Sequence, residues 1–192
     1  VTSLVGDVLN ALDYLHSKGV IHRDIKPSNI MVDKTGHVKL MDLGIARVTS
    51  ANSYTSTGFV GTPLYASPEQ IMRDKMLVQA TPASDIYSLG MTLYVLLNGE
   101  HPFDADTEAQ ILVNQVTKKL PMAKSLEKKY RKLMDVIWKA TDKDPDKRFQ
   151  KALDFKYAIE KAMEPVMIPW WYFVLGVLVI GLIIGIIILI VI

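Results

Sequence analysis

The amino-acid sequence predicts a mainly α-helical domain that contains one short β-hairpin and is followed by a single membrane-spanning helix. Apolar residues recur at helical spacing in most segments of the first part of the chain. Two short strand-like runs flank a four-residue turn. All 22 basic and 20 acidic residues precede Trp170, whereas residues 173–192 contain no charge. We therefore expect a folded domain over residues 1–163, an interfacial segment over 164–172 and a transmembrane helix over 173–192.

The first element is an amphipathic helix over residues 2–17. Its main apolar positions recur three or four residues apart, at Leu4, Val8, Leu12 and Leu15. Gly19 supplies the stop signal that follows a helix.

A β-hairpin follows, with strand-like runs at residues 30–32 and 37–41 and a turn at 33–36. The two strands of a hairpin lie side by side. The hairpin is therefore expected to bring Asn29, which enters it, next to Asp42, which leaves it.

The remainder of the domain is expected to be loop and helix. Residues 45–61 are rich in Ser, Thr, Asn and Gly and show no periodicity, which predicts a flexible loop. Helical patterns follow near residues 84–97, 107–118, 126–140 and 151–163. No other strand signal is strong.

The segment 173–192 has 20 apolar residues without a charge or a proline, and as a helix it is about 30 Å long, the thickness of a bilayer core. Three aromatic residues precede it, as at a membrane interface: Trp170, Trp171 and Tyr172. A buried core helix is the alternative. Basic residues before the span favour a single-pass protein with a cytoplasmic domain. Gly181 and Gly185 lie one turn apart, so a homodimer through this helix is a further hypothesis, against the simpler view that glycine is common in membrane helices.

Composition excludes several classes of function. The chain has no cysteine, which rules out disulfides and Cys-zinc sites. The net charge of +2 gives no reason to expect a nucleic-acid partner. The four histidines are scattered, without the close pair of a metal-binding helix.

The motif His22-Arg23-Asp24-Ile25-Lys26-Pro27-Ser28-Asn29, followed by Asp42-Leu43-Gly44, contains the groups that phosphoryl transfer requires. A carboxylate and a lysine lie two residues apart, and an amide and a second carboxylate follow. The later motifs GTPLYASPE, SDIYSLG, NGEHPF and DPDKRF come in the order found in the large lobe of protein kinases. The chain resembles the eukaryotic-like serine/threonine kinases of bacteria, which often carry one membrane helix after the kinase domain.

The resemblance implies a role for each residue of the first two motifs. Asp24 is the catalytic base, and Lys26 contacts the γ-phosphate of ATP. Asn29 and Asp42 bind Mg²⁺, with Mn²⁺ as an alternative, and oxygen ligands suit such ions. Gly44 allows the turn at the metal-binding loop. A loop cap for Asp24, a solvated lysine and an Asx turn at Asn29 are the structural alternatives.

The resemblance also implies a phosphorylated activation loop. An arginine at the position of Arg23 pairs with a loop phosphate in the family, and a phosphate brings about two negative charges that an arginine can order. We expect autophosphorylation at one or more of Thr55, Ser56 and Thr57; the alternative is a loop that is simply solvated.

Further residues are assigned supporting roles by the resemblance. Glu69 and Arg148 form a buried ion pair, and Asp85 receives backbone N–H groups of the catalytic loop; surface charges and a helix cap are the alternatives. The other supporting residues are His22 and Leu43, which pack together, and Thr62, which contacts Asp24 and Lys26. Leu43 departs from the commoner phenylalanine, and we expect a leucine to pack against the core equally well.

The predicted function is transfer of the ATP γ-phosphate to Ser or Thr of protein substrates in membrane-linked signalling. The sequence contains no glycine-rich loop or VAIK-type lysine of a small lobe. Residues 1–192 alone are therefore expected to be inactive. The alternative is a membrane-tethered pseudokinase that acts as a binding or scaffolding module.

Overall fold

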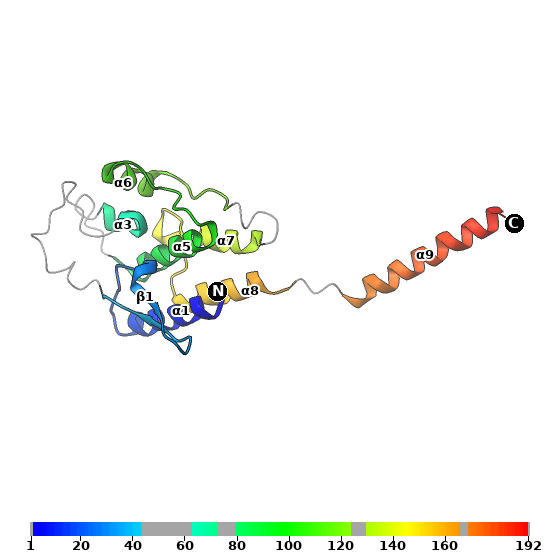
Figure 1. The fold of residues 1–192 in the computed structure, drawn as a ribbon, viewed down its shortest axis with the longest axis horizontal. Helices are drawn as coiled ribbons and strands as arrows, with labels where there is room; N and C mark the ends of the chain where they lie inside the picture. The colour runs from blue at the N-terminus through cyan, green and yellow to red at the C-terminus, as the bar shows by residue number, and fades with distance from the viewer. Residues whose placement is uncertain (1, 44–62, 73–79, 124–129, 166–168, 192) are drawn as a thin grey trace, which may run out of the picture.

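The computed structural model describes residues 2–43, 63–72, 80–123, 130–165 and 169–191, without the side chains of residues 2, 3, 185 and 187–191. Within these residues the fold is mainly helical and contains one two-stranded sheet (Figure 1). The α-helices are α1 (Thr2–Ser17), α3 (Pro68–Ile71), α5 (Pro82–Asn98), α6 (Glu108–Thr117), α7 (Arg131–Ala140), α8 (Ala152–Met163) and α9 (Trp170–Val191). The strands are β1 (Ile30–Val32) and β2 (Val38–Leu40), and the 3-10 helices are η1 (Pro27–Asn29), η2 (Pro63–Tyr65) and η3 (Pro145–Lys147).

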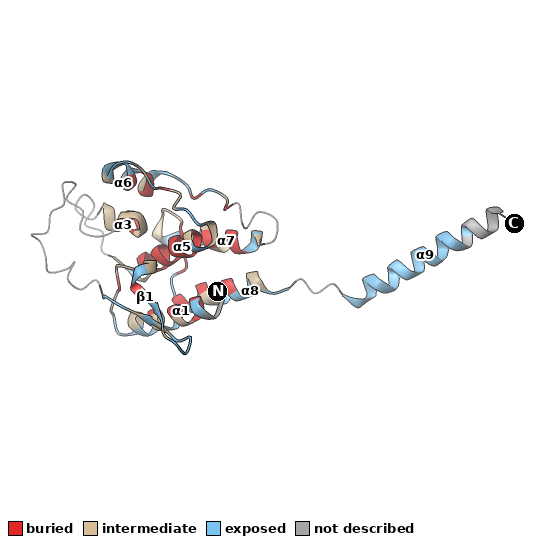
Figure 2. Cartoon of the chain, viewed as in Figure 1, coloured by how far each residue is buried: buried red, intermediate tan, exposed pale blue. Residues whose placement is uncertain are grey.

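Helix α5 is the centre of the domain. Its residues from Ala83 to Tyr94 are all buried, and Figure 2 shows this helix as the most continuously buried element. A helix that is covered on every side has to be apolar all round, as this one largely is. Gly90 allows the close approach of α7, since a Cβ there would lie 2.9 Å from Cγ2 of Thr141.

The two ends of α5 follow from local sequence. At the N-terminus, Thr81 and Ser84 form a capping box, and Pro82 occupies the first turn, where its missing N–H costs nothing. At the C-terminus, Gly99 adopts φ 82°, the left-handed conformation that terminates helices. The sequence predicts a start near residue 84, and the helix begins two residues earlier, at Pro82, because proline is favourable in the first turn of a helix.

Helices α1 and α8 pack against each other, and α8 also packs against α7. Helix α1 has the predicted bounds, and Val8, Leu9 and Leu12 lie in the core. Its apolar side chains belong to the same hydrophobic core as Phe155 and Ile159 of α8. The amphipathic pattern of the first 17 residues is therefore used for packing, as the sequence predicts.

The predicted hairpin is confirmed. Strands β1 and β2 are antiparallel, with Ile30 opposite Leu40 and Val32 opposite Val38. The second strand begins at Val38 instead of His37, because the backbone N–H of His37 is bound to the Asp33 carboxylate at 3.0 Å. Asp33 therefore organises the turn.

Several segments differ from the prediction or lie outside the described residues. Helix α3 and the 3-10 helices, which start with proline, were not predicted. Residues 45–61 lie outside the described part, as do residues 124–129 at the start of the helix predicted for 126–140. The described helix there, α7, begins at Arg131.

Helix α9 begins three residues before the predicted span, so that the aromatic residues form its first turn. The rings of Trp171 and Tyr172 stack at 4.0 Å. Its described apolar side chains are exposed (Figure 2). Within the part of the chain that the structure describes, no helix has both the length and the apolar character needed to cross a membrane.

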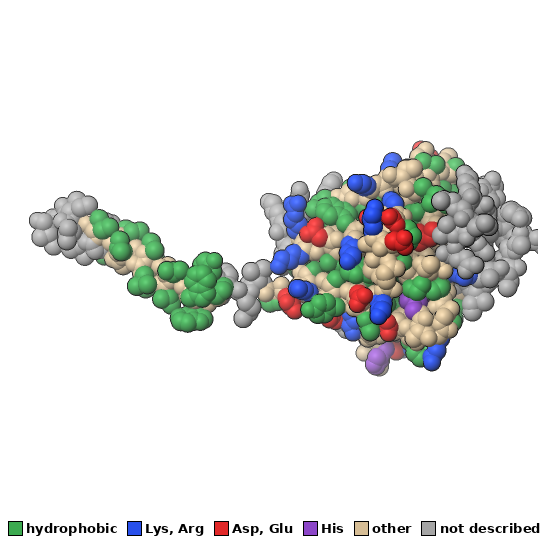
Figure 3. Space-filling view, turned by 180° about the vertical axis from the view of Figure 1, so that it is seen from behind, with side chains coloured by type: hydrophobic (Ala, Val, Ile, Leu, Met, Phe, Trp, Pro, Cys, Tyr) green, Lys and Arg blue, Asp and Glu red, His purple; other side chains and the backbone are tan. Residues whose placement is uncertain are grey.

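The surface of the helical domain is mixed in character. On the face shown in Figure 3, basic and acidic side chains are interspersed with each other and with apolar ones. Arg148, which the sequence places among the basic residues before the aromatic segment, is only 3 % exposed and does not contribute to this surface.

Candidate active site

The loop before β1 brings together Asp24, Lys26 and Asn29. The Lys26 ammonium lies 3.0 Å from Oδ2 of Asp24. The Asn29 amide nitrogen donates to the same oxygen at 3.1 Å and to the Asp24 backbone carbonyl at 2.8 Å. Asn29 is buried, while the side chains of Asp24 and Lys26 are 14 % and 20 % exposed. The carboxylate is thus oriented by two neighbours and remains accessible.

The backbone of this loop is held in an uncommon conformation. Arg23 has φ 68°, in the left-handed region that side chains other than glycine rarely occupy. On the other side of Asp24, Pro27 begins η1, and the Asn29 N–H donates to the Lys26 carbonyl at 3.0 Å. A strained residue persists only where its surroundings hold it in place.

Asp85, on the first turn of α5, provides this hold. Its Oδ1 accepts the Arg23 N–H at 2.7 Å, and its Oδ2 accepts the His22 N–H at 2.9 Å. Nε2 of His16 lies 2.8 Å from Oδ2 as well. Asp85 is fully buried. The predicted contact between this carboxylate and the catalytic-loop backbone is therefore present.

His22 joins the loop to the hairpin. Its Nδ1 accepts the Asp24 N–H at 3.3 Å, and Nε2 lies 3.0 Å from the Met41 carbonyl, so these partners assign the proton to Nε2. The ring is fully buried. The ring therefore connects Met41, the residue before Asp42, with the backbone of Asp24.

Asp42 is the fourth predicted residue. The Met41 N–H donates to the Asn29 carbonyl at 2.9 Å, so the hairpin places Asp42 one residue beyond the partner of Asn29. Asp42 is exposed and has φ 54°. Because the donor end of the Asn29 amide is bound to Asp24, its oxygen is left to act as a ligand. This oxygen and the Asp42 carboxylate fit a hard cation such as Mg²⁺. No cluster of three or more His, Asp or Glu residues suited to a metal occurs in the described part of the chain.

Helix α3 is attached to the same loop. The Gln70 side-chain oxygen accepts from the Ser67 N–H and hydroxyl, each at 3.0 Å, which caps the helix. The Gln70 amide nitrogen donates to the Arg23 carbonyl at 3.0 Å. The segment that contains η2 and α3 therefore lies directly beside the residue that precedes Asp24.

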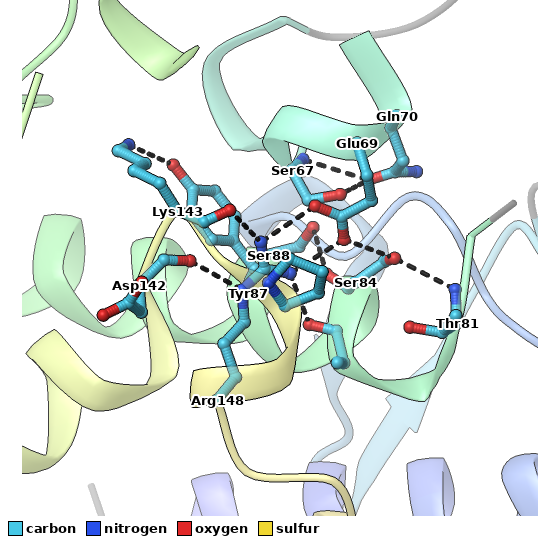
Figure 4. A network of polar contacts seen from close by, with 12 residues as sticks. Ser67, Glu69, Gln70, Thr81, Ser84, Tyr87, Ser88, Asp142, Lys143 and Arg148 are labelled. Atoms are coloured by element: carbon cyan, nitrogen blue, oxygen red, sulfur yellow. Dashed lines mark hydrogen bonds and ion pairs between the residues drawn. The ribbon is translucent and has the colours of Figure 1, made fainter. Parts of the chain in front are cut away.

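Glu69 and Arg148 form the predicted ion pair, shown in Figure 4. Two parallel contacts of 2.7 and 2.8 Å join the guanidinium to the carboxylate, and the Ser84 hydroxyl donates to the same carboxylate at 2.7 Å. Burial acts to raise the pKa of Glu69, but the hydrogen bonds and charge of Arg148 outweigh burial and hold this pKa below its ordinary value. Arg148 also donates to the Asp142 carbonyl at 2.7 Å and the Ala83 carbonyl at 3.0 Å.

Leu43 does not take the predicted position. It is 42 % exposed, whereas the sequence predicts a residue packed against the core. Its backbone is at the end of the described hairpin segment, where the chain has left β2. Five other predicted residues lie outside the described part: Gly44, Thr55, Ser56, Thr57 and Thr62.

Sequence reasoning missed three supporting residues. His16 binds Asp85, Gln70 binds the catalytic loop, and Ser84 binds Glu69. His16 had a signal, because it lies four residues after Leu12 on the apolar face of α1, and a polar side chain there requires a partner. Gln70 and Ser84 had the capping-box spacing with Ser67 and Thr81.

A lysine-paired carboxylate next to an amide, with a second carboxylate just after the adjoining strand, is the set of groups that phosphoryl-transfer enzymes use. The comparisons with known proteins specify the class further. The family model for the protein kinase domain matches residues 1–162. The chain therefore belongs to the protein kinase family.

Two of the relatives that the chain matches are bacterial proteins. The chain is 40 % identical over 157 residues to serine/threonine-protein kinase PknB of Mycobacterium tuberculosis. The aligned region covers 80 % of this chain and 24 % of that protein. The chain is 42 % identical over 153 residues to a probable PknB of Bifidobacterium longum, covering 78 % of this chain and 22 % of the relative. Both relatives are named as serine/threonine-protein kinases, the second as a probable one. The chain spans about a quarter of the length of these relatives.

Proposed function

We propose that the protein containing this chain transfers the γ-phosphate of ATP to Ser or Thr hydroxyl groups of protein substrates. The cluster of Asp24, Lys26 and Asn29 is the observation that supports this proposal most directly. The part of its loop that leads into Asp24 is held by two buried groups, Asp85 of α5 and the His22 ring. Such preorganisation is what phosphoryl transfer requires of a protein, since most of the catalysis is positioning and charge stabilisation.

Each residue then has one task. Asp24 accepts the proton of the substrate hydroxyl and orients its oxygen for attack. Lys26, 3.0 Å from that carboxylate, places a positive charge where the transferred phosphoryl group has to pass. Asn29 and Asp42 are the residues that hold Mg²⁺, which neutralises phosphate charge when ATP is bound.

The test uses the full-length protein that contains this chain, with radiolabelled ATP and a protein substrate. Asp24→Asn keeps the size of the side chain and removes its basicity, so transfer should fall by about 10²–10⁴-fold, the range for general base catalysis. The matched control is Asp154→Asn, an exposed carboxylate on α8, which should leave the rate unchanged. Equal rates for Asp24→Asn and the unchanged protein would refute the role of Asp24. ATP binding without transfer by the unchanged protein would instead support a pseudokinase that acts as a binding module.

We further propose membrane attachment on the strength of the sequence of residues 173–192, and a cytoplasmic kinase domain on the strength of the basic residues before this segment. This segment contains 20 consecutive apolar residues and lies within α9, apart from its last residue. Vesicle flotation tests the proposal: the full-length protein should float with liposomes, and a protein with Phe173–Ile192 replaced by a Gly/Ser linker should not. Gly181 and Gly185 are the positions at which cross-linking tests a homodimer.

Regulation by autophosphorylation is a separate part of the proposal. Arg23 precedes the catalytic carboxylate, and phosphate on Thr55, Ser56 or Thr57 would give this arginine an anionic partner. Mass spectrometry of active full-length protein should find phosphate between residues 49 and 57, and its absence would refute this part. We also propose that residues 1–192 alone transfer phosphate negligibly, because they contain no glycine-rich loop to cover ATP.

A further inference from the structure

A second set of polar contacts connects helices α5 and α6 and the segment after α7 with η2, the segment before α3. Lys143 donates to the Tyr87 hydroxyl at 2.9 Å, and that hydroxyl donates to the Gln115 side-chain oxygen at 2.6 Å. The amide nitrogen of Gln115 donates to the backbone carbonyls of Leu64 and, at 3.3 Å, Pro63. Figure 4 shows Lys143 reaching the Tyr87 hydroxyl.

Gln115, on α6, is the central residue of this set. It is fully buried, and both ends of its amide are used. Only an amide can accept a hydrogen bond from Tyr87 and also donate to the two carbonyls. The side chain therefore fixes the position of η2 relative to α5 and α6.

Lys143 restrains Gln115 from the other side. Its ammonium donates to the Gln115 backbone carbonyl at 2.6 Å and lies 4.6 Å from the centre of the Phe103 ring. Burial and the positive charge of Arg148 lower the pKa of Lys143 from 10.5 to about 8. Because burial disfavours the charged form, the contacts with the Tyr87 hydroxyl and the Gln115 carbonyl are what compensate the ammonium there.

The other end of the η2 segment is attached to the catalytic loop. From Tyr65 the chain continues through Ala66 into α3, where Gln70 donates to the Arg23 carbonyl. Residues 63–65 are half-buried, so they retain surface for an external contact while two of their carbonyls are turned toward Gln115. A polypeptide whose hydroxyl reaches Asp24 has to lie against a surface beside this loop, and η2 is held as such a surface.

We propose that Gln115 is a positioning residue for protein substrates. It holds η2, through the Pro63 and Leu64 carbonyls, in the conformation against which the acceptor polypeptide lies. Tyr87 and Lys143 hold Gln115 in turn. This inference rests on the proposed function.

The test is Gln115→Glu in the full-length protein. The glutamate has the same shape but cannot donate to the carbonyls. With two hydrogen bonds lost, the KM for the protein substrate should rise roughly tenfold. The KM for ATP and the slow hydrolysis of ATP without a protein substrate should be unchanged, because neither uses η2. Gln110→Glu makes the same change on the exposed side of α6 and should alter none of these quantities.

Tyr87→Phe is the second variant, because it removes one oxygen and leaves the ring in place. It should raise the KM for the protein substrate by about two- to fivefold, in line with one hydrogen bond lost. An unchanged KM in both variants, or an equal loss of ATP hydrolysis and protein phosphorylation, would overturn the inference. If the unchanged protein hydrolyses ATP but phosphorylates no protein, the proposed function fails.

Discussion

The domain contains two pairs of opposite charges that resemble each other in distance but differ in their surroundings. Lys26 lies 3.0 Å from Asp24, with 20 % and 14 % of the two side chains exposed. Arg148 lies 2.7 Å from Glu69, with 0 % and 4 % exposed. The first pair makes one close contact beside solvent, whereas the second makes two parallel contacts in the core. The first therefore retains charge that a substrate can use, and the second has its charge satisfied within the protein.

The partners of the second pair explain its role. Arg148 joins the carboxylate of α3 to carbonyls of α5 and of the segment after α7. Removing one member of such a pair leaves a buried charge without compensation, while removing both members together is far less costly. The pair thus fixes the arrangement of elements more than it adds net stability.

The largest expected effect comes from breaking this buried pair. Arg148→Met should lower the free energy of unfolding by about 3–5 kcal/mol, because the Glu69 carboxylate stays buried. Urea denaturation of the full-length protein, followed by a probe in the kinase domain, measures this. Lys147→Met is the matched control, since the neighbouring Lys147 has an exposed contact with Asp144 worth about 0–1 kcal/mol. Equal losses in the two variants would contradict the comparison.

A smaller effect is expected where a histidine supports the buried Asp85 carboxylate. His16→Leu removes one of the hydrogen bonds to Asp85, while the backbone N–H groups of His22 and Arg23 remain. We expect a loss of about 1–3 kcal/mol in the free energy of unfolding, the range for a buried acceptor that loses a partner. His37→Leu, at an exposed histidine, should stay within about 0.5 kcal/mol. A result for His16→Leu no larger than that control would refute the contribution of His16.

The Lys26–Asp24 pair, unlike the Arg148–Glu69 pair, is expected to matter more for the rate of transfer than for stability. Lys26→Met should change the free energy of unfolding by less than about 1 kcal/mol, because the Lys26–Asp24 contact is partly exposed. The same variant should lower the rate of phosphate transfer by at least about tenfold, since one charge at the phosphoryl group is lost. Urea denaturation and radiolabelled transfer measured on the same preparation check both statements. A stability loss as large as that of Arg148→Met would show that the two pairs do not differ.

The sequence predicts the local elements well for physical reasons. Helix α1 and the hairpin follow from the spacing of apolar residues and from turn chemistry, which act over a few positions. The catalytic loop lies within eight residues, so Asp24, Lys26 and Asn29 meet through local geometry. The partner of His16, by contrast, lies 69 residues away in Asp85, and periodicity has no information about such contacts. The role of Gln115 was missed for the same reason, since its partners lie on η2 and α5.

Leu43 shows that burial, too, is only partly predictable from the sequence. The sequence predicts that this apolar residue is buried, yet 42 % of Leu43 is exposed. Hydrophobicity predicts that a side chain favours burial, but the covering elements decide whether it is buried.

The smallest expected effect concerns a carboxylate whose pKa is lowered mainly by hydrogen bonds. The Asp33 carboxylate accepts the Thr35 hydroxyl at 2.6 Å and the backbone N–H groups of Thr35 and His37, and these bonds, that of the Thr35 hydroxyl above all, lower its pKa from 3.8 to about 2. Because the folded pKa is the lower one, the stabilisation of the turn is present above pH 3.8 and is lost as the pH falls through about 2. Thr35→Val should move the pKa of Asp33 back toward 3.8, as measured by NMR titration of the carboxyl carbon, while Thr117→Val on α6 should not. An unchanged value would mean that the backbone N–H groups alone lower this pKa. The turn that positions β2, and with it Asp42, would then be independent of the threonine hydroxyl.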